Sequence, residues 1–325
     1  MYKRQTEAGS LASWIAAGTS YAHTGVPMVP FYIFYSMFGL QRVGDLVWAA
    51  GDSRARGFLL AATAGRTTLE GEGLQHQDGH SLVLASTFPS LEAYDPAFAY
   101  EMGTIIRHGL HRMYGKGDDN SYYLTLYNEN YQQPKKPEGI NDGIIAGMYR
   151  FAEAPAETRY RTTILFSGSA HTAAREAQKI LFERYGVGAE LWSVTSYKKL
   201  REEALEVERW NRLHPGQERR APLVSRLLAL TRGPIVAVTD YMHAVPDQIS
   251  RWAPRRFITL GTDGYGRSDT REAVRRFFET DEASVTVAAL SGLVETGEME
   301  AALVDEAIRT FGLDPDSAAP WTRDA

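Results

Sequence analysis

The chain alternates short apolar runs, each of a length suited to a buried strand, with longer segments of helical periodicity. The apolar runs are residues 28–38, 58–65, 81–86, 121–128, 162–170, 189–196, 234–240 and 256–261. Helical patterns occupy residues 7–22, 41–57, 97–115 and 173–186, and Gly115 is expected to end the third of them. Strands buried on both faces and separated by helices are typical of parallel sheets. The pattern therefore predicts an α/β protein with mostly parallel sheets.

A break in this alternation divides the chain. Residues 132–143, "QQPKKPEGINDG", contain two prolines, two glycines and four charged side chains, and another proline follows within 152–158. Prolines and glycines in such a cluster favour a loop over a regular element. A length of 325 residues also suits two domains. We therefore expect one domain over 1–135, a linker over 136–157 and a second domain over 158–325.

Composition excludes several classes of function. The net charge of -5 argues against a general nucleic-acid or anionic-membrane surface. There is no cysteine, which excludes disulfides, thiolate zinc sites and cysteine nucleophiles and favours the cytoplasm. No apolar run reaches the ~18 residues of a membrane helix. Residues 1–5, "MYKRQ", join a helical pattern without a cap, and we expect them to be a non-native scar.

Residues 71–80, "GEGLQHQDGH", place His76 and His80 four residues apart. On a helix this spacing suits two metal ligands, but Gly71, Gly73 and Gly79 favour a loop, and no third ligand is fixed by the spacing. One alternative is a polar loop whose histidines bind backbone or water. Another is a catalytic loop, because loops that follow buried strands carry the sites of α/β sheets. The residues alone leave these three interpretations open.

Three further stretches allow two interpretations each. Residues 261–269, "GTDGYGRSD", are either a phosphate-binding loop or, with better odds, a structural turn capped by Ser268 or Asp269. Residues 166–170, "FSGSA", form a similar and equally weak turn motif. The aromatic run 31–39 is either core or, less often, a wall for a planar ring.

Taken together, several stretches resemble one family. They are "PFYIFYSMFGLQRVGD", "GRTTLEGEGLQHQDGHS", "YDPAFAYE", "NENY", "SVTSY", "ERWNRLHP" and "GTDGYGRSD". In this order they resemble pyruvate dehydrogenase (acetyl-transferring) of the homodimeric type, the decarboxylating component of the pyruvate dehydrogenase complex, which depends on thiamin diphosphate. The resemblance runs from about Thr6 to the last few residues.

The resemblance implies two transketolase-like domains. The first would be a pyrimidine-binding domain shortened at its N-terminus, and the second a transketolase C-terminal-like domain. The family's Gly-Asp-Gly motif for diphosphate and magnesium does not occur in this sequence. The chain therefore resembles only the C-terminal portion of the family. We expect no metal ligand within it and expect the magnesium ligands in the domain that precedes this portion.

Site residues also follow from the resemblance. Glu7 matches the glutamate that hydrogen-bonds the pyrimidine ring of the cofactor. Phe38 matches the aromatic side chain stacked on that ring, and Tyr35 matches a tyrosine of the pocket. His76 matches the histidine that orients substrate and donates a proton during lipoyl acetylation, a role that suits imidazole near neutral pH. Residues expected around them in supporting positions are Arg42, Glu72 and His80.

The implied reaction is decarboxylation of pyruvate followed by acetylation of a lipoyl group on the acetyltransferase component. The implied partners are a second copy in a homodimer and the lipoyl domain, and we expect the chain to be inactive alone. One alternative is a related 2-keto-acid dehydrogenase or transketolase-like enzyme. Another is a non-catalytic fragment that dimerises.

Overall fold

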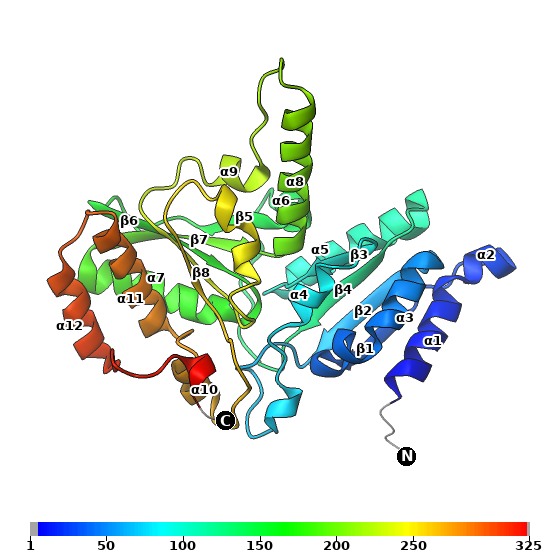
Figure 1. The fold of residues 1–325 in the computed structure, drawn as a ribbon, viewed down its shortest axis with the longest axis horizontal. Helices are drawn as coiled ribbons and strands as arrows, with labels where there is room; N and C mark the ends of the chain where they lie inside the picture. The colour runs from blue at the N-terminus through cyan, green and yellow to red at the C-terminus, as the bar shows by residue number, and fades with distance from the viewer. Residues whose placement is uncertain (1–5, 324–325) are drawn as a thin grey trace.

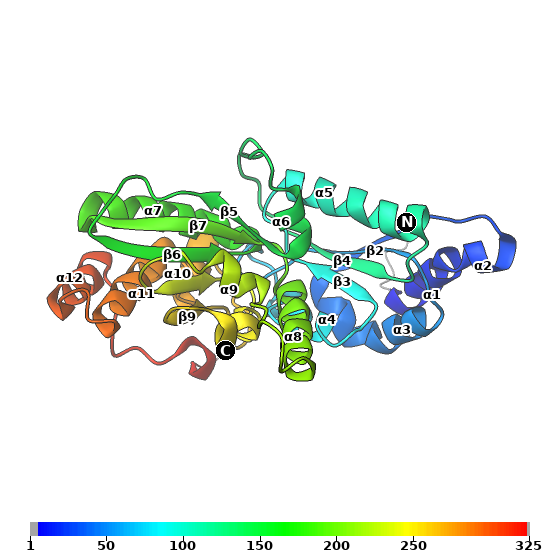
Figure 2. The same cartoon turned by 90° about the horizontal axis from the view of Figure 1, so that it is seen from above.

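The computed structural model describes residues 6–323, so the expected scar at 1–5 lies outside the described residues. The first half of the chain forms a four-stranded sheet of order β1-β2-β4-β3, in which every pair of neighbours is parallel. Its strands are β1 (Phe31–Tyr35), β2 (Gly57–Ala62), β3 (Leu91–Tyr94) and β4 (Ser121–Leu126). Figure 2 shows α5 on one face of this sheet and α3 and α4 on the other. The helices of this half are α1 (Glu7–Gly18), α2 (Ser20–Thr24), α3 (Leu40–Asp52), α4 (Ser81–Ala85) and α5 (Ala99–Leu110).

The second half forms a five-stranded sheet of order β5-β7-β6-β8-β9, beside the first sheet in Figure 1. Only β5 pairs antiparallel among the described strands of this sheet, which are β5 (Met148–Ala152), β6 (Tyr160–Phe166), β7 (Val187–Val194), β8 (Ile235–Val238) and β9 (Phe257–Leu260). Its helices are α6 (Asn141–Ala146), α7 (His171–Tyr185), α8 (Tyr197–Leu213), α9 (Leu223–Leu227), α10 (Arg271–Phe277), α11 (Glu282–Glu295) and α12 (Ala301–Phe311). The predicted α/β class with mostly parallel sheets is confirmed. Within 6–323 no helix is long and apolar enough to cross a membrane.

The prediction of a strand at 81–86 is wrong, because these residues form helix α4. Short apolar runs do not distinguish a strand from a buried helix by periodicity. Here the carboxylate of Asp78 accepts hydrogen bonds from the backbone N–H groups of His80 and Ser81, both at 3.0 Å. Such bonds satisfy N–H donors that a helix N-terminus leaves free, so they favour a helix over a strand at these residues.

The predicted end of the helix at 97–115 needs correction. Helix α5 continues as a π-helical turn, His111–Lys116, and ends at Gly117 rather than at Gly115. Gly117 has φ +83°, a left-handed conformation that favours glycine. The range 136–157, expected to be a linker, contains α6 and β5, and β5 pairs with β7 of the second sheet. We therefore propose that the second domain begins before residue 148, and the other predicted boundaries stay predictions.

The two sheets share one apolar core. Leu59 and Tyr123 of the first sheet belong to the same buried cluster as Leu165 and Trp192 of the second. A buried carboxylate adds polar contacts across the junction: Glu101 of α5 accepts hydrogen bonds from the hydroxyls of Tyr149 and Ser193, both at 2.6 Å. Burial raises the pKa of Glu101. The second half of the chain is thus fixed to the first by packing and by hydrogen bonds.

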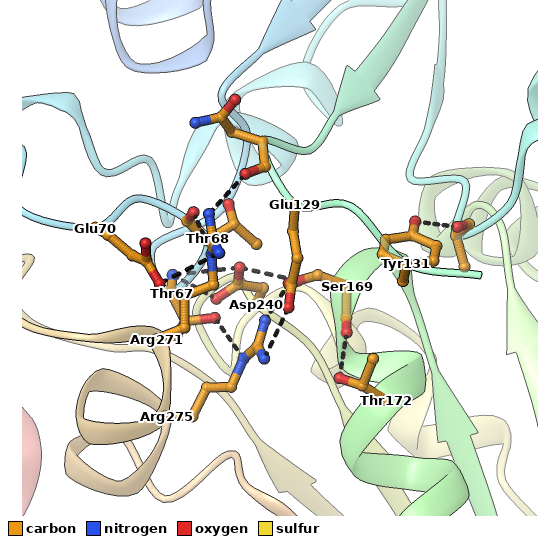
Figure 3. Close-up of polar contacts among 12 residues, drawn as sticks. Thr67, Thr68, Glu70, Glu129, Tyr131, Ser169, Thr172, Asp240, Arg271 and Arg275 are labelled. Carbon is orange, nitrogen blue, oxygen red and sulfur yellow. Dashed lines mark hydrogen bonds and ion pairs between the residues drawn. The ribbon is translucent and has the colours of Figure 1, made fainter. Parts of the chain in front are cut away.

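A second buried carboxylate, Asp240, follows β8 and joins the halves at the loop that starts at Gly65 (Figure 3). It accepts hydrogen bonds from the backbone N–H of Thr67 at 3.0 Å and from the hydroxyl of Ser169 at 3.0 Å. A Cβ at Gly65 would lie 2.2 Å from its Oδ2, so glycine is needed for this approach. Arg275 lies beside it and pairs with Glu129. Burial raises the pKa of Asp240 to about 6, despite these partners.

This raised pKa predicts a pH-dependent contribution to stability. The folded protein holds the Asp240 proton more tightly than the unfolded chain does, so its stabilising contribution is complete below about pH 4 and is lost as pH rises through 6. Asp240→Asn cannot titrate. The free energy of unfolding of the wild type, relative to Asp240→Asn, should therefore fall by on the order of 1 kcal/mol between pH 5 and pH 8.

Urea unfolding of both proteins at the two pH values measures this difference. Asp305→Asn, which changes an exposed carboxylate on α12, serves as the matched control and should show no such trend. A pH-independent difference between wild type and Asp240→Asn would contradict the assignment.

Candidate active site

The predicted site residues gather where β1 ends. Tyr35 is the last residue of β1, and the chain then makes a 3-10 turn, Ser36–Phe38, before α3 begins. Arg42 lies in the first turn of α3, and Glu7 is the first residue of α1. Helices α1 and α3 pack against each other, which brings these positions together. Carboxyl ends of parallel strands are the usual location of sites in such sheets.

An ion pair and an aromatic ring form one side of the cluster. The Arg42 guanidinium lies 3.2 Å from the Glu7 carboxylate, and its central carbon lies 4.3 Å from the centroid of the Phe38 ring. The Glu7 side chain is 12% exposed, whereas Phe38 is buried. A carboxylate, a planar cation and an aromatic face thus lie in series. The arrangement suits a ligand with a flat ring and a polar edge.

His76 adds an imidazole to the same cluster. Its ring centroid lies 5.4 Å from that of Phe38 and 5.5 Å from that of Tyr35. Its Nδ1 lies 3.3 Å from the carbonyl oxygen of Gly73. A proton on Nδ1 would donate to this carbonyl and leave Nε2 as the atom for proton exchange. The structure therefore brings together Glu7, Tyr35, Phe38, Arg42 and His76.

A residue not singled out in the sequence, Asp78, holds this arrangement in place. It is fully buried, and its Oδ2 accepts a hydrogen bond from the hydroxyl of Ser36, which is also fully buried. Its Oδ1 accepts the two backbone N–H groups at the start of α4. One carboxylate thus connects the loop that carries His76 with the turn that carries Phe38. The only sequence signal was a lone acidic residue shortly before an apolar run.

The two remaining candidates lie outside the ring cluster. The Nε2 of His80 is 2.9 Å from Oε1 of Gln41, so its imidazole contacts α3. Glu72 contributes its backbone carbonyl, which accepts a hydrogen bond from the hydroxyl of Ser268. Its carboxylate makes no hydrogen bond or ion pair with any residue in the described range 6–323. In that range no three His, Asp or Glu side chains gather as metal ligands either.

The aromatic run 31–39 is only partly core. Phe34 and Phe38 are buried, but Phe31, Ile33 and Tyr35 are 48%, 61% and 40% exposed. Alternate side chains of a strand point to opposite faces, and one face of β1, at the edge of the sheet, lacks a cover within residues 6–323. The prediction of a core stretch therefore holds for one face of the strand.

The glycine-rich segment 261–269 joins β9 to α10 and contacts the His76 loop through Ser268 and Arg267. The predicted cap is wrong, because the side chain of Thr270, rather than of Ser268 or Asp269, accepts the backbone N–H of Ala273. Its contacts with residues 71–80 favour the structural interpretation of this segment.

Comparison with known proteins agrees with this architecture. Residues 2–134 match the family described as pyruvate dehydrogenase E1 component middle domain, and residues 147–281 match the transketolase-like TK C-terminal domain. The pyruvate dehydrogenase E1 component of Pseudomonas aeruginosa is 52% identical over 97% of this chain and 36% of its own length. That of Escherichia coli is 48% identical over 97% of this chain and 35% of its own length. The chain thus spans about a third of the length of these curated relatives.

Solved structures show the same fold at lower identity. Transketolase from Campylobacter jejuni superposes with a TM-score of 0.62 at 17% identity, covering 85% of this chain and 38% of that one. An inactive β4 tetramer of a split-gene transketolase superposes with a TM-score of 0.62 at 16% identity, covering 87% of this chain and 81% of that one. Over 97% of its length the chain is thus similar to pyruvate dehydrogenase E1 components, with a match to their middle domain followed by a match to a transketolase-like C-terminal domain.

Proposed function

We propose that this chain is the part of a thiamin-diphosphate-dependent pyruvate dehydrogenase component that binds the pyrimidine ring of the cofactor and the reacting substrate. The observation that carries the proposal is the contact series Glu7–Arg42–Phe38–His76 at the end of β1. The reaction would be decarboxylation of pyruvate and transfer of the acetyl group to a lipoyl group.

The donor set fits the cofactor. An aminopyrimidine is planar, aromatic and edged with nitrogen, and it needs an aromatic face beside a carboxylate. The planar guanidinium of Arg42 already contacts the Phe38 ring and pairs with the Glu7 carboxylate. Glu7 would hydrogen-bond the pyrimidine nitrogen, and Phe38 with Tyr35 would contact the ring. The bound cofactor would supply the electron sink for loss of carbon dioxide.

His76 is proposed to orient substrate and to deliver a proton during lipoyl acetylation. With Nδ1–H directed at the Gly73 carbonyl, Nε2 would exchange the proton. The rings of Phe38 and Tyr35 lie beside the imidazole and restrict its tilt. General acid–base groups typically contribute about 10²–10⁴-fold to the step that they serve.

Other polypeptide is proposed to complete the site. The chain spans about a third of its relatives' length, and the family's Gly-Asp-Gly motif is absent from the sequence, so we expect the magnesium ligands elsewhere. The exposed face of β1 continues into Val26, Met28 and Val29, and residues 25–39 carry no charged side chain. Exposed apolar edge strands are typical contact surfaces. The proposed partners are a second copy in a homodimer and the lipoyl domain, and the proposed location is the cytoplasm.

The purified chain alone should not decarboxylate pyruvate, because the half of the site that binds diphosphate and magnesium is proposed to come from other polypeptide. Carbon dioxide release can be measured with thiamin diphosphate and magnesium present. The positive control is a chimera in which residues 6–323 replace the matching part of the Pseudomonas aeruginosa relative. Release by the chain alone at a rate near that of the chimera would refute the proposal.

His76→Ala in the same chimera should slow lipoyl acetylation by about 10²-fold or more, the range expected for a general acid. Decarboxylation in a single turnover should be affected much less. His80→Ala is the matched control, since its imidazole contacts Gln41 and lies outside the ring cluster. Equal losses in both half-reactions for both variants would count against the role assigned to His76.

A further inference from the structure

The side chain that follows His76 links the substrate loop to the second half of the protein. Gln77 is fully buried. Its Nε2 donates to the carbonyl oxygen of Arg267 at 2.6 Å, and its Oε1 accepts the backbone N–H of Arg267 at 2.7 Å. One side-chain amide thus occupies both backbone groups of a residue 190 positions away in sequence. Nε2 also lies 3.4 Å from the carbonyl oxygen of Leu69, within its own loop.

The contact depends on a glycine. A Cβ at Gly266 would lie 2.3 Å from Oε1 of Gln77, so any larger residue there would displace the amide. Gly266 does not have a left-handed φ, so space rather than backbone conformation requires glycine. Two neighbouring contacts also join the His76 loop to the second half of the chain. The hydroxyl of Ser268 donates to the carbonyl of Glu72, and the N–H of Met242, which follows β8, donates to the carbonyl of Gly79 at 2.8 Å.

Gln75, on the other side of His76, is exposed. His76 therefore lies between an exposed glutamine and a buried one. The backbone N–H of His76 donates to the carbonyl oxygen of Gly73 at 2.9 Å, and its Nδ1 lies 3.3 Å from the same oxygen, which is long for a hydrogen bond. The contacts of the next residue, Gln77, with the Arg267 backbone fix the chain directly beside His76 to the second half of the protein.

We propose that Gln77 is a positioning residue: by binding the backbone of Arg267, it uses the C-terminal domain to hold His76 against Phe38 and Tyr35. This role rests on the proposed function, because fixing the imidazole matters for catalysis only if His76 acts on substrate. A catalytic group displaced by about 1 Å can lose on the order of 10²-fold in rate. The 261–269 segment is then part of the site although it touches no reacting atom.

The NMR signals of the His76 imidazole can be recorded in the intact chain and assigned by comparison with the spectrum of His76→Ala. The rings of Phe38 and Tyr35 shift these signals, so the shifts report the position of the imidazole. Gln77→Ala and Gly266→Ala should both abolish much of this ring-current shift. Exchange of the Arg267 amide hydrogen should become about fivefold faster or more, as expected for a lost hydrogen bond. Gln75→Ala should change neither.

Gly266→Ala leaves residues 71–80 untouched, so it tests the contact from the other side if Gln77→Ala unfolds the loop. Urea unfolding checks that each variant remains folded. Unchanged His76 signals in a folded Gln77→Ala or Gly266→Ala protein would overturn the proposal, and so would equal changes in Gln75→Ala. These signals do not depend on activity. Loss of the ring-current shift would therefore support positioning even if His76→Ala left acetyl transfer unchanged, a result that would refute only the proposed function.

Discussion

The arrangement of the site depends on the buried carboxylate of Asp78. It accepts a hydrogen bond from Ser36 in the turn that carries Phe38, and two more from the backbone at the start of α4. A carboxylate buried without such partners would be strongly destabilising. Asp78 lies in the His76 loop, and its partners lie in the turn after β1 and at the start of α4, so satisfying this one group fixes the three segments relative to one another. The His76 loop is thereby held beside the turn that carries Phe38.

Buried polar groups with specific partners also fix the second half of the protein to the first. Glu101 and Asp240 are buried carboxylates that each accept at least one hydrogen bond from across the junction, and Gln77 binds the Arg267 backbone there. Polar groups buried at a junction require specific partners, so they define one relative placement of the two sheets more sharply than apolar packing does. The C-terminal domain thereby acts as a rigid support for a loop that belongs to the first.

The sequence predicted the sheets well because buried strands leave a strong local signal. The runs at 28–38 and 121–128 contain β1 and β4, and the run at 58–65 overlaps β2. It failed at 81–86, where Asp78 accepts hydrogen bonds from the backbone at the start of helix α4. Within 136–157, where composition favoured a loop, β5 pairs with β7, a strand distant in sequence. Among the site residues, Glu7, Tyr35, Phe38 and His76 came from resemblance to a family and not from periodicity. Asp78 and Gln77 were not predicted as site residues, because their partners Ser36 and Arg267 lie 42 and 190 positions away in the sequence.

We propose that the cluster of Glu7, Phe38 and His76 receives the reacting part of a thiamin cofactor. A crystal structure of the chimeric enzyme with thiamin diphosphate and magnesium would test this proposal. We expect the pyrimidine ring to lie against Phe38, with the Glu7 carboxylate within hydrogen-bond distance of a ring nitrogen and His76 facing the reacting carbon. A cofactor bound elsewhere, with the Glu7–Arg42 pair and the Phe38 face untouched, would contradict it.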